Sequence, residues 1–226
     1  MFIIQYVMNL SFTEENYLKA IYSLSASNRS FETFTNEIAD KISIKPSTVT
    51  DMLRKLTEKK LINYKKYKSV KLTSVGKNIA LQVIRKHRLW EVFLHQRLKF
   101  NWGEVHVVAE QLEHIQSEKL IEALDKYLGY PEYDPHGDPI PKSNGQLPNT
   151  SNITLYEVEE GKVYKVVALK DTSTSFLQYL QHIKIGIGSK IKVVEKIPFD
   201  GSLSIIIGKG MKTVVSKKFA ENVLVS

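Results

Sequence analysis

Apolar residues in the first quarter of the chain recur every three or four positions, in three separate groups. This spacing places them on one face of a helix, so each group predicts a short amphipathic helix. A threonine or a proline stands at the expected start of each helix, where it can cap or begin the first turn. The predicted helices begin at Thr13, Thr35 and Pro46, and the third ends near Lys60.

Two stretches at 61–64 and 69–73 predict the strands of a hairpin with a basic tip. Helix, helix, tight turn, helix and hairpin is the order of elements in a winged helix-turn-helix. Short polar side chains at the start of the third helix can approach base edges, and lysines of the tip can reach phosphates. The predicted DNA-binding residues are Lys45, Ser47, Thr48, Thr50, Lys65, Lys66 and Lys68.

Helical periodicity continues through the middle of the chain, and the C-terminal third changes to strands. One long helix is expected from Ser74 to about Lys99, and the apolar helical pattern extends to Gly129. Residues 131–148 are rich in Pro, Gly, Asp and Asn, which predicts a structured turn and a linker. The remainder predicts a small barrel of about five strands with one short helix. The expected strands lie at 162–169, 190–197, 202–207 and 212–216, and the helix at 176–183.

Composition narrows the class of protein. With 226 residues, 42% hydrophobic and 25% charged, the chain has the make-up of an ordinary globular protein. It contains no cysteine, which excludes disulfides, thiolate metal sites and cysteine nucleophiles. The apolar start, residues 1–8, has no basic segment or cleavage site and is interpreted as a loose leader, not a signal peptide. No apolar run is long enough to cross a bilayer, so a soluble cytoplasmic protein is expected.

The net charge of +8 is unevenly distributed. Residues 41–77 contain eleven Lys or Arg against two acids, a net charge of +9. Residues 104–138 contain nine acids against two lysines, a net charge of −7. A basic block followed by an acidic, histidine-bearing block indicates one part that binds a polyanion and one that binds a cation. Solvated surface is the alternative interpretation of the basic block.

The segment 106–114 carries the most specific chemistry. On a helix its two histidines and two glutamates fall within about one third of the circumference, opposite an apolar face. Imidazole and carboxylate donors with no intervening Lys or Arg suit a first-row divalent metal. A solvated acidic face that contains two histidines is the alternative. The four residues are His106, Glu110, Glu113 and His114.

These motifs resemble those of the iron- and manganese-dependent repressors typified by the diphtheria toxin repressor and the manganese transport regulator. The resemblance covers nearly the whole chain, and the spacing of its His and Glu residues is the specific part. The matching pieces are Glu15-Asn16-Tyr17-Leu18-Lys19-Ala20-Ile21-Tyr22, Lys86-His87-Arg88-Leu89 with Glu91, His106, Glu110-Gln111-Leu112-Glu113-His114 and Asp138-Pro139-Ile140-Pro141.

The resemblance implies two metal sites. Asn16, Glu110, Glu113 and His114 match the primary, activating site, and His87, Glu91 and His106 match an ancillary site. Glutamate at position 110, where iron-responsive members have cysteine, favours Mn(II), with Fe(II) also possible. Two departures stand out. Asn16 replaces methionine or aspartate, and Lys19 replaces a glutamate that coupled two-metal clusters require, which favours separated sites. Asp171 is the nearest carboxylate by which the barrel could complete the ancillary site.

The resulting hypothesis is an α+β, multidomain protein that acts as a metal-activated transcriptional repressor of metal uptake or homeostasis genes. It would bind a double-stranded DNA operator as a homodimer, without a membrane or a small organic substrate, and would not be an enzyme. A metal-dependent hydrolase and a metal-independent winged-helix protein are the alternatives. The expected domains are a winged helix-turn-helix at 9–74, a helical metal-binding and dimerisation domain at 75–142, a linker at 143–152 and an SH3-like barrel at 153–226.

Overall fold

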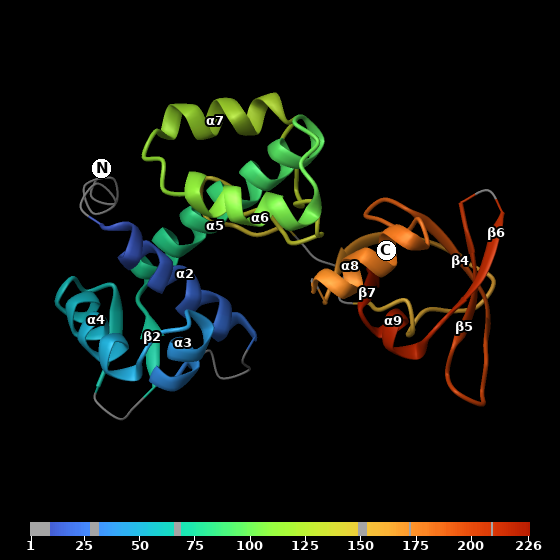
Figure 1. The fold of residues 1–226 in the computed structure, drawn as a ribbon, viewed down its shortest axis with the longest axis horizontal. Helices are drawn as coiled ribbons and strands as arrows, with labels where there is room; N and C mark the ends of the chain where they lie inside the picture. Colours follow the sequence, from blue (N-terminus) through green and yellow to red (C-terminus); the bar gives the residue numbers. More distant parts are fainter. Residues whose placement is uncertain (1–9, 28–31, 66–68, 149–152, 172, 209) are drawn as a thin grey trace. The chain divides into compact units, whose positions relative to one another are not determined.

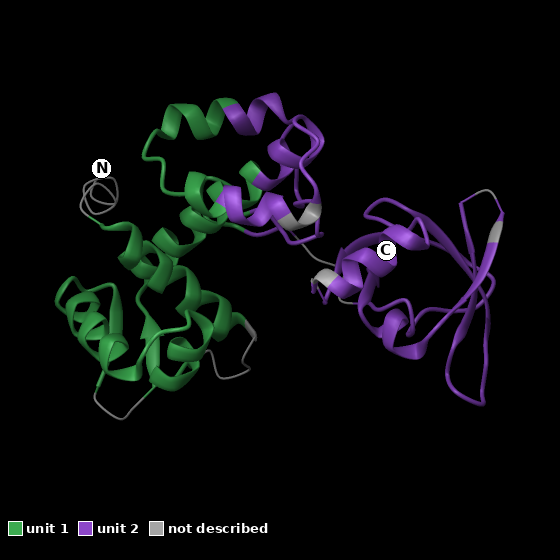
Figure 2. Ribbon diagram, in the orientation of Figure 1, with its two compact units in different colours: residues 1–90, 110–123, 141–146 green, residues 91–109, 124–140, 147–226 purple. Residues whose placement is uncertain are grey.

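The computed structural model describes residues 10–27, 32–65, 69–148, 153–171, 173–208 and 210–226. The chain forms two compact units, which are coloured separately in Figure 2. The first contains residues 1–90, 110–123 and 141–146, and the second contains residues 91–109, 124–140 and 147–226. The boundary falls within the central helical region, which contributes residues to both units.

The predicted winged helix-turn-helix forms in the first unit (Figure 1). Its wing is a two-stranded antiparallel sheet in which Asn63 pairs with Lys71. Ser43, with φ of 55°, forms the tight turn between the second and third helices, and the turn is closed by a 3.0 Å hydrogen bond from the Ile44 amide to the Ala39 carbonyl. The elements are α2 (Phe12–Ser27), α3 (Thr35–Lys41), α4 (Pro46–Glu58), β1 (Ile62–Tyr64) and β2 (Val70–Leu72).

The predicted helix starts at Thr35 and Pro46 are confirmed, and only the first helix starts earlier than predicted. The first helix, α2, begins before Thr13, because Ser11 and Glu14 exchange backbone-to-side-chain hydrogen bonds of 3.3 and 2.8 Å. This reciprocal pair is a capping box, which satisfies two amide groups that the helix itself leaves unpaired. Thr35 is the first residue of α3, and the Glu37 carboxylate accepts a hydrogen bond from the Phe34 amide in front of it.

Apolar side chains of α2, α3, α4 and the wing meet in one core. Leu18, Ile21, Ile38 and Leu53 are each 0% exposed there. Burial of such side chains is the main source of stability in a domain of this size. Because α2 contributes to this core, the DNA-binding part of the unit is built around the helix that also carries Asn16.

Three further helices follow the wing: α5 (Ser74–Gln96), α6 (Trp102–Leu112) and α7 (Glu118–Tyr127). One expectation needs correction here, because Glu113 and His114 lie in the turn after α6 and not on the helix itself. The sequence pattern assigned both residues to the helix, which ends at Leu112, one residue before Glu113. None of the helices that the structure describes is long and apolar enough to span a membrane.

The C-terminal part is an antiparallel five-stranded sheet with strand order β6-β5-β4-β3-β7 (Figure 1). Its core is apolar, and α8 (Thr174–His182) and α9 (Lys217–Glu221) contribute to it through residues such as Leu177 and Phe219. Four strands were located from the sequence, but α9 and the three-residue strand β7 were not. The strands are β3 (Val163–Leu169), β4 (Lys190–Lys196), β5 (Leu203–Ile207), β6 (Met211–Val215) and β7 (Val223–Val225).

Candidate metal site

Glu113, in the turn after α6, is the centre of the predicted primary site. Its side chain is 0% exposed, and both of its oxygens are occupied. The Lys19 ammonium of α2 donates to Oε1 at 2.7 Å and to Oε2 at 2.9 Å. His87 Nδ1 of α5 lies 2.6 Å from Oε2. A carboxylate in the turn after α6 is therefore held by side chains of two helices, α2 and α5.

The protonation of Glu113 follows from these partners. Burial raises the pKa of the Glu113 carboxyl, but the hydrogen bond with His87 and the charge of Lys19 outweigh burial and hold the pKa below its usual value. The side chain is therefore an anion at neutral pH, as a metal ligand must be.

His114 is held by Glu15, a residue of α2 that was not predicted as a site residue from the sequence. Glu15, also 0% exposed, accepts a hydrogen bond from His114 Nδ1 at 2.5 Å and from Gln116 Nε2 at 2.8 Å. The ring of Phe12 stacks on the imidazole with a centroid distance of 4.5 Å. Because the Glu15 carboxylate can only accept a hydrogen bond, the His114 proton lies on Nδ1. The lone pair of Nε2 is then available to a metal. The signal available in the sequence was that Glu15 adjoins Asn16 within the family motif.

Asn16 and Glu110, the other two predicted primary ligands, lie on the walls of one groove of about 510 Å³. Lys19 lies on the same groove, and its ammonium is 3.8 Å from Glu110 Oε1. Asn16 and Lys19 are three residues apart on α2, so they share one face of that helix. The structure thus places Glu110 and Glu113 beside the Lys19 ammonium, and Asn16 lines the same groove.

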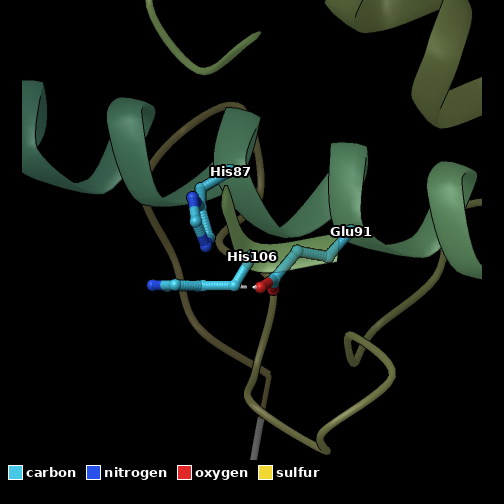
Figure 3. Close-up of side chains that lie close together, drawn as sticks. All are labelled: His87, Glu91 and His106. Carbon is cyan, nitrogen blue, oxygen red and sulfur yellow. Dashed lines mark hydrogen bonds and ion pairs between the residues drawn. The ribbon is translucent and has the colours of Figure 1, made fainter. Parts of the chain in front are cut away.

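The three predicted ancillary residues also meet. One ligand atom from each of His87, Glu91 and His106 lies within 4.8 Å of the others (Figure 3). His87 and Glu91 are one turn apart on α5, and His106 Nδ1 of α6 lies 3.3 Å from Glu91 Oε1. Imidazole and carboxylate donors this close together could share one cation.

His136 was not assigned to a site from the sequence, and the structure places it beside Glu91. It is 8% exposed, and its Nε2 lies 3.6 Å from Glu91 Oε1. Burial lowers the pKa of His136, but hydrogen bonding with Glu91 and the charges of Asp134 and Asp138 raise it above its usual value overall. Asp171, the predicted barrel ligand, accepts a 2.8 Å hydrogen bond from the Ser173 amide just before α8.

The predicted DNA-contacting residues of α4 lie at its start. Ser47 and Thr48 are exposed, while Thr50 is half-buried and donates to the Pro46 carbonyl at 3.0 Å. Lys45 precedes the first turn, and Lys65 is exposed at the end of β1. Exposed polar groups at the start of a recognition helix are available to base edges. Lys66 and Lys68 lie outside the described residues.

Comparison with known proteins assigns most of the chain to three family models. The family model "Iron dependent repressor, N-terminal DNA binding domain" matches residues 9–70. The model "Iron dependent repressor, metal binding and dimerisation domain" matches residues 73–142, and the FeoA domain matches residues 153–226.

Individual relatives agree with these models. A solved structure described as a manganese-dependent transcriptional repressor in complex with manganese is 33% identical, covers 94% of this chain and 98% of that one, and has a TM-score of 0.80. The iron-dependent repressor IdeR of Mycobacterium leprae (strain TN) is 33% identical over 162 residues, which is 69% of this chain and 70% of that protein. A probable metal transport system membrane protein of Chlamydia trachomatis is 45% identical over 71 residues, and the match spans 31% of this chain and 16% of that protein.

The winged helix-turn-helix and the adjoining nitrogen and oxygen donors define a DNA-binding regulator of the metal-dependent class. The chain belongs to the iron-dependent repressor family, whose proteins are DNA-binding transcriptional repressors and not enzymes. This membership confirms the predicted fold class and repressor function and excludes the hydrolase alternative. Both manganese- and iron-dependent repressors are among the relatives, in agreement with the predicted metals.

Proposed function

We propose that this chain is a Mn(II)-activated repressor whose activating ion is held by Asn16, Glu110, Glu113 and His114. The observation that carries the proposal is the pair of contacts from α2 to the end of α6, between Lys19 and Glu113 and between Glu15 and His114. Through them, the core helix of the DNA-binding part is attached to the candidate metal ligands.

The donor chemistry fits the ion. The proposed site has three carboxylate or amide oxygens and one imidazole nitrogen, and the chain has no cysteine. Oxygen and imidazole donors suit Mn(II), and Fe(II) is accepted by the same set, whereas a thiolate would favour softer metals. When bound, the ion would supply a positive charge held jointly by Asn16 of α2, Glu110 of α6 and the two residues of the turn after α6.

The chain's own residues convert that link into DNA binding. Leu18 and Ile21 of α2 are fully buried against the core that contains Leu53 of α4. A change in the position of α2 is therefore transmitted to the recognition helix by packing, because close-packed side chains move together. We propose that metal occupancy favours the position of α4 in which two copies of the chain fit two half-sites of an operator.

A second part of the proposal concerns the ancillary group. His87, Glu91 and His106 are proposed to hold a further ion, and His136 Nε2 lies 3.6 Å from Glu91 Oε1 beside this group. Asp171 remains a candidate ligand from the barrel.

The proposed domains are residues 9–74, 75–142 and 153–226, with a linker at 143–152. Because a repressor acts on DNA, we propose that this protein is located in the cytoplasm.

The test is DNA binding as a function of metal. A labelled duplex is selected by the protein from random sequence in the presence of Mn(II), and fluorescence anisotropy is then measured with and without Mn(II). We expect tight binding only with metal in the wild type, and loss of the metal response in Glu113→Ala. Glu118→Ala, which removes an exposed acid at the start of α7, is the matched control and should respond like the wild type.

Two outcomes contradict the proposal. Equal binding with and without Mn(II) in the wild type supports a metal-independent winged-helix protein. A full Mn(II) response in Glu113→Ala removes Glu113 from the ligand set. Repeating the DNA-binding assay with Fe(II) in place of Mn(II), under anaerobic conditions, shows which of the two metals activates DNA binding.

A further inference from the structure

We propose that Lys19 is a tethered cation that occupies the primary site in the absence of metal and sets the metal concentration at which the repressor responds. The proposal rests on the proposed function above, because it assigns a role to Lys19 at the same site. It begins from the fact that the Lys19 ammonium contacts both oxygens of Glu113 and approaches Glu110.

The contacts of Lys19 are those that a bound cation would make. The distances are 2.7 and 2.9 Å to the two Glu113 oxygens and 3.8 Å to Glu110 Oε1. Two carboxylates that are proposed as metal ligands thus share one ammonium group. A metal ion that takes the same oxygens must displace the ammonium, because the two cations repel and compete for the same lone pairs.

The burial of Glu113 explains why a cation is needed there without metal. A fully buried carboxylate without a counter-charge is strongly unfavourable. Lys19, whose side chain is 20% exposed, supplies that charge from α2. The ion pair of Lys19 with Glu113 therefore stabilises the folded protein without metal. The same ion pair opposes metal binding, because it must be broken first.

The groove beside the site gives the displaced side chain somewhere to go. Lys19 borders this groove of about 510 Å³ together with the polar residues Thr13 and Ser23. A lysine stem is flexible and its ammonium is strongly hydrated, so it can turn from Glu113 towards water in the groove. Lys19 is thus a positioning residue that makes metal binding an exchange of one cation for another.

The experiment compares full-length Lys19→Met with Lys41→Met. Methionine keeps an unbranched side chain and removes the charge, and Lys41 lines the same groove, so both variants lose one positive charge from the same region. Mn(II) affinity is measured by isothermal titration calorimetry. We expect Lys19→Met to bind Mn(II) at least about tenfold more tightly than the wild type, and Lys41→Met to stay within about twofold of it.

A second readout requires no metal. Thermal unfolding of the metal-free proteins should show a lower Tm for Lys19→Met than for Lys41→Met, and Mn(II) should raise the Tm of Lys19→Met by more than it raises that of the wild type. Lys19→Arg, which keeps the charge, should retain wild-type Mn(II) affinity to within about threefold.

The outcomes separate this proposal from the proposed function. If the wild type binds Mn(II) and Lys19→Met binds it no more tightly than Lys41→Met does, the role of Lys19 is overturned while the metal site stands. If neither the wild type nor Lys19→Met binds Mn(II), both the proposed function and the role of Lys19 are contradicted.

Discussion

Replacing Glu15 by glutamine tests whether a carboxylate behind His114 prepares that imidazole to bind metal. In the native protein Glu15 accepts two hydrogen bonds, from His114 at 2.5 Å and from Gln116 at 2.8 Å. Glutamine has nearly the same shape but carries no charge, and one of its two polar groups is a donor. The bond to the imidazole is therefore weakened in every orientation of the new amide.

The structure allows two orientations, and each lowers metal affinity. If the amide oxygen faces His114, a charged hydrogen bond becomes a neutral one, which costs about 1 kcal/mol. If the amide nitrogen faces His114, Nδ1 must accept, and the proton moves to Nε2, the atom that would ligate the metal. Losing such a supporting partner typically weakens metal binding about 10- to 100-fold, or roughly 1.4–2.8 kcal/mol.

Mn(II) calorimetry of Glu15→Gln measures this effect, and ¹⁵N NMR of labelled histidine reports which His114 nitrogen carries the proton. Glu14→Gln is the matched control, since it removes the same charge one residue earlier, where Glu14 pairs with Lys59 at 2.6 Å. An affinity of Glu15→Gln within about twofold of the Glu14→Gln value would refute the argument that Glu15 orients His114.

Three further predictions address selectivity, DNA docking and folding. Glu110→Cys should shift activation from Mn(II) towards Co(II) or Zn(II), because a thiolate is a softer donor, and an unchanged metal ranking in the DNA-binding assay would exclude Glu110 as a ligand. Lys65→Ala should reduce the slope of log affinity against log salt by about one, whereas Thr48→Ala should alter base preference with little change in slope, and identical behaviour of the two would contradict the docking model. Gly76→Ala should destabilise the DNA-binding part by about 3 kcal/mol in urea unfolding, because its new Cβ would lie 2.0 Å from the Leu61 carbonyl oxygen.

Local patterns in the sequence were sufficient for most of the fold. The helical spacing that predicted α4 from Pro46 reflects side chains such as Val49 and Leu53, which are buried on one face of that helix. Local periodicity carries less information where an element is short. Strand β7 has only three residues, Val223–Val225, and its existence depends on pairing with β3, which lies far away in the sequence.

The same limit applies to the candidate site. Residue types and spacing identified Glu113 and His114, but not their partners Lys19 and Glu15, which are 94 and 99 residues away. Such pairings arise when helices pack, so no local pattern reports them. His136 was missed for the same reason, because its proximity to Glu91 depends on how the 131–141 turn folds back.

The division of α2 into two faces has a consequence for how such a sensor can diversify. Leu18 and Ile21 are buried in the DNA-binding core, whereas Asn16 is exposed and Lys19 is half-buried beside the candidate ligands. If Asn16 and Lys19 act as proposed, substitutions at these two positions would change which ion is sensed, and at what concentration, without repacking the DNA-binding core. A single helix thus lets the input of the regulator change over evolution while its output is preserved.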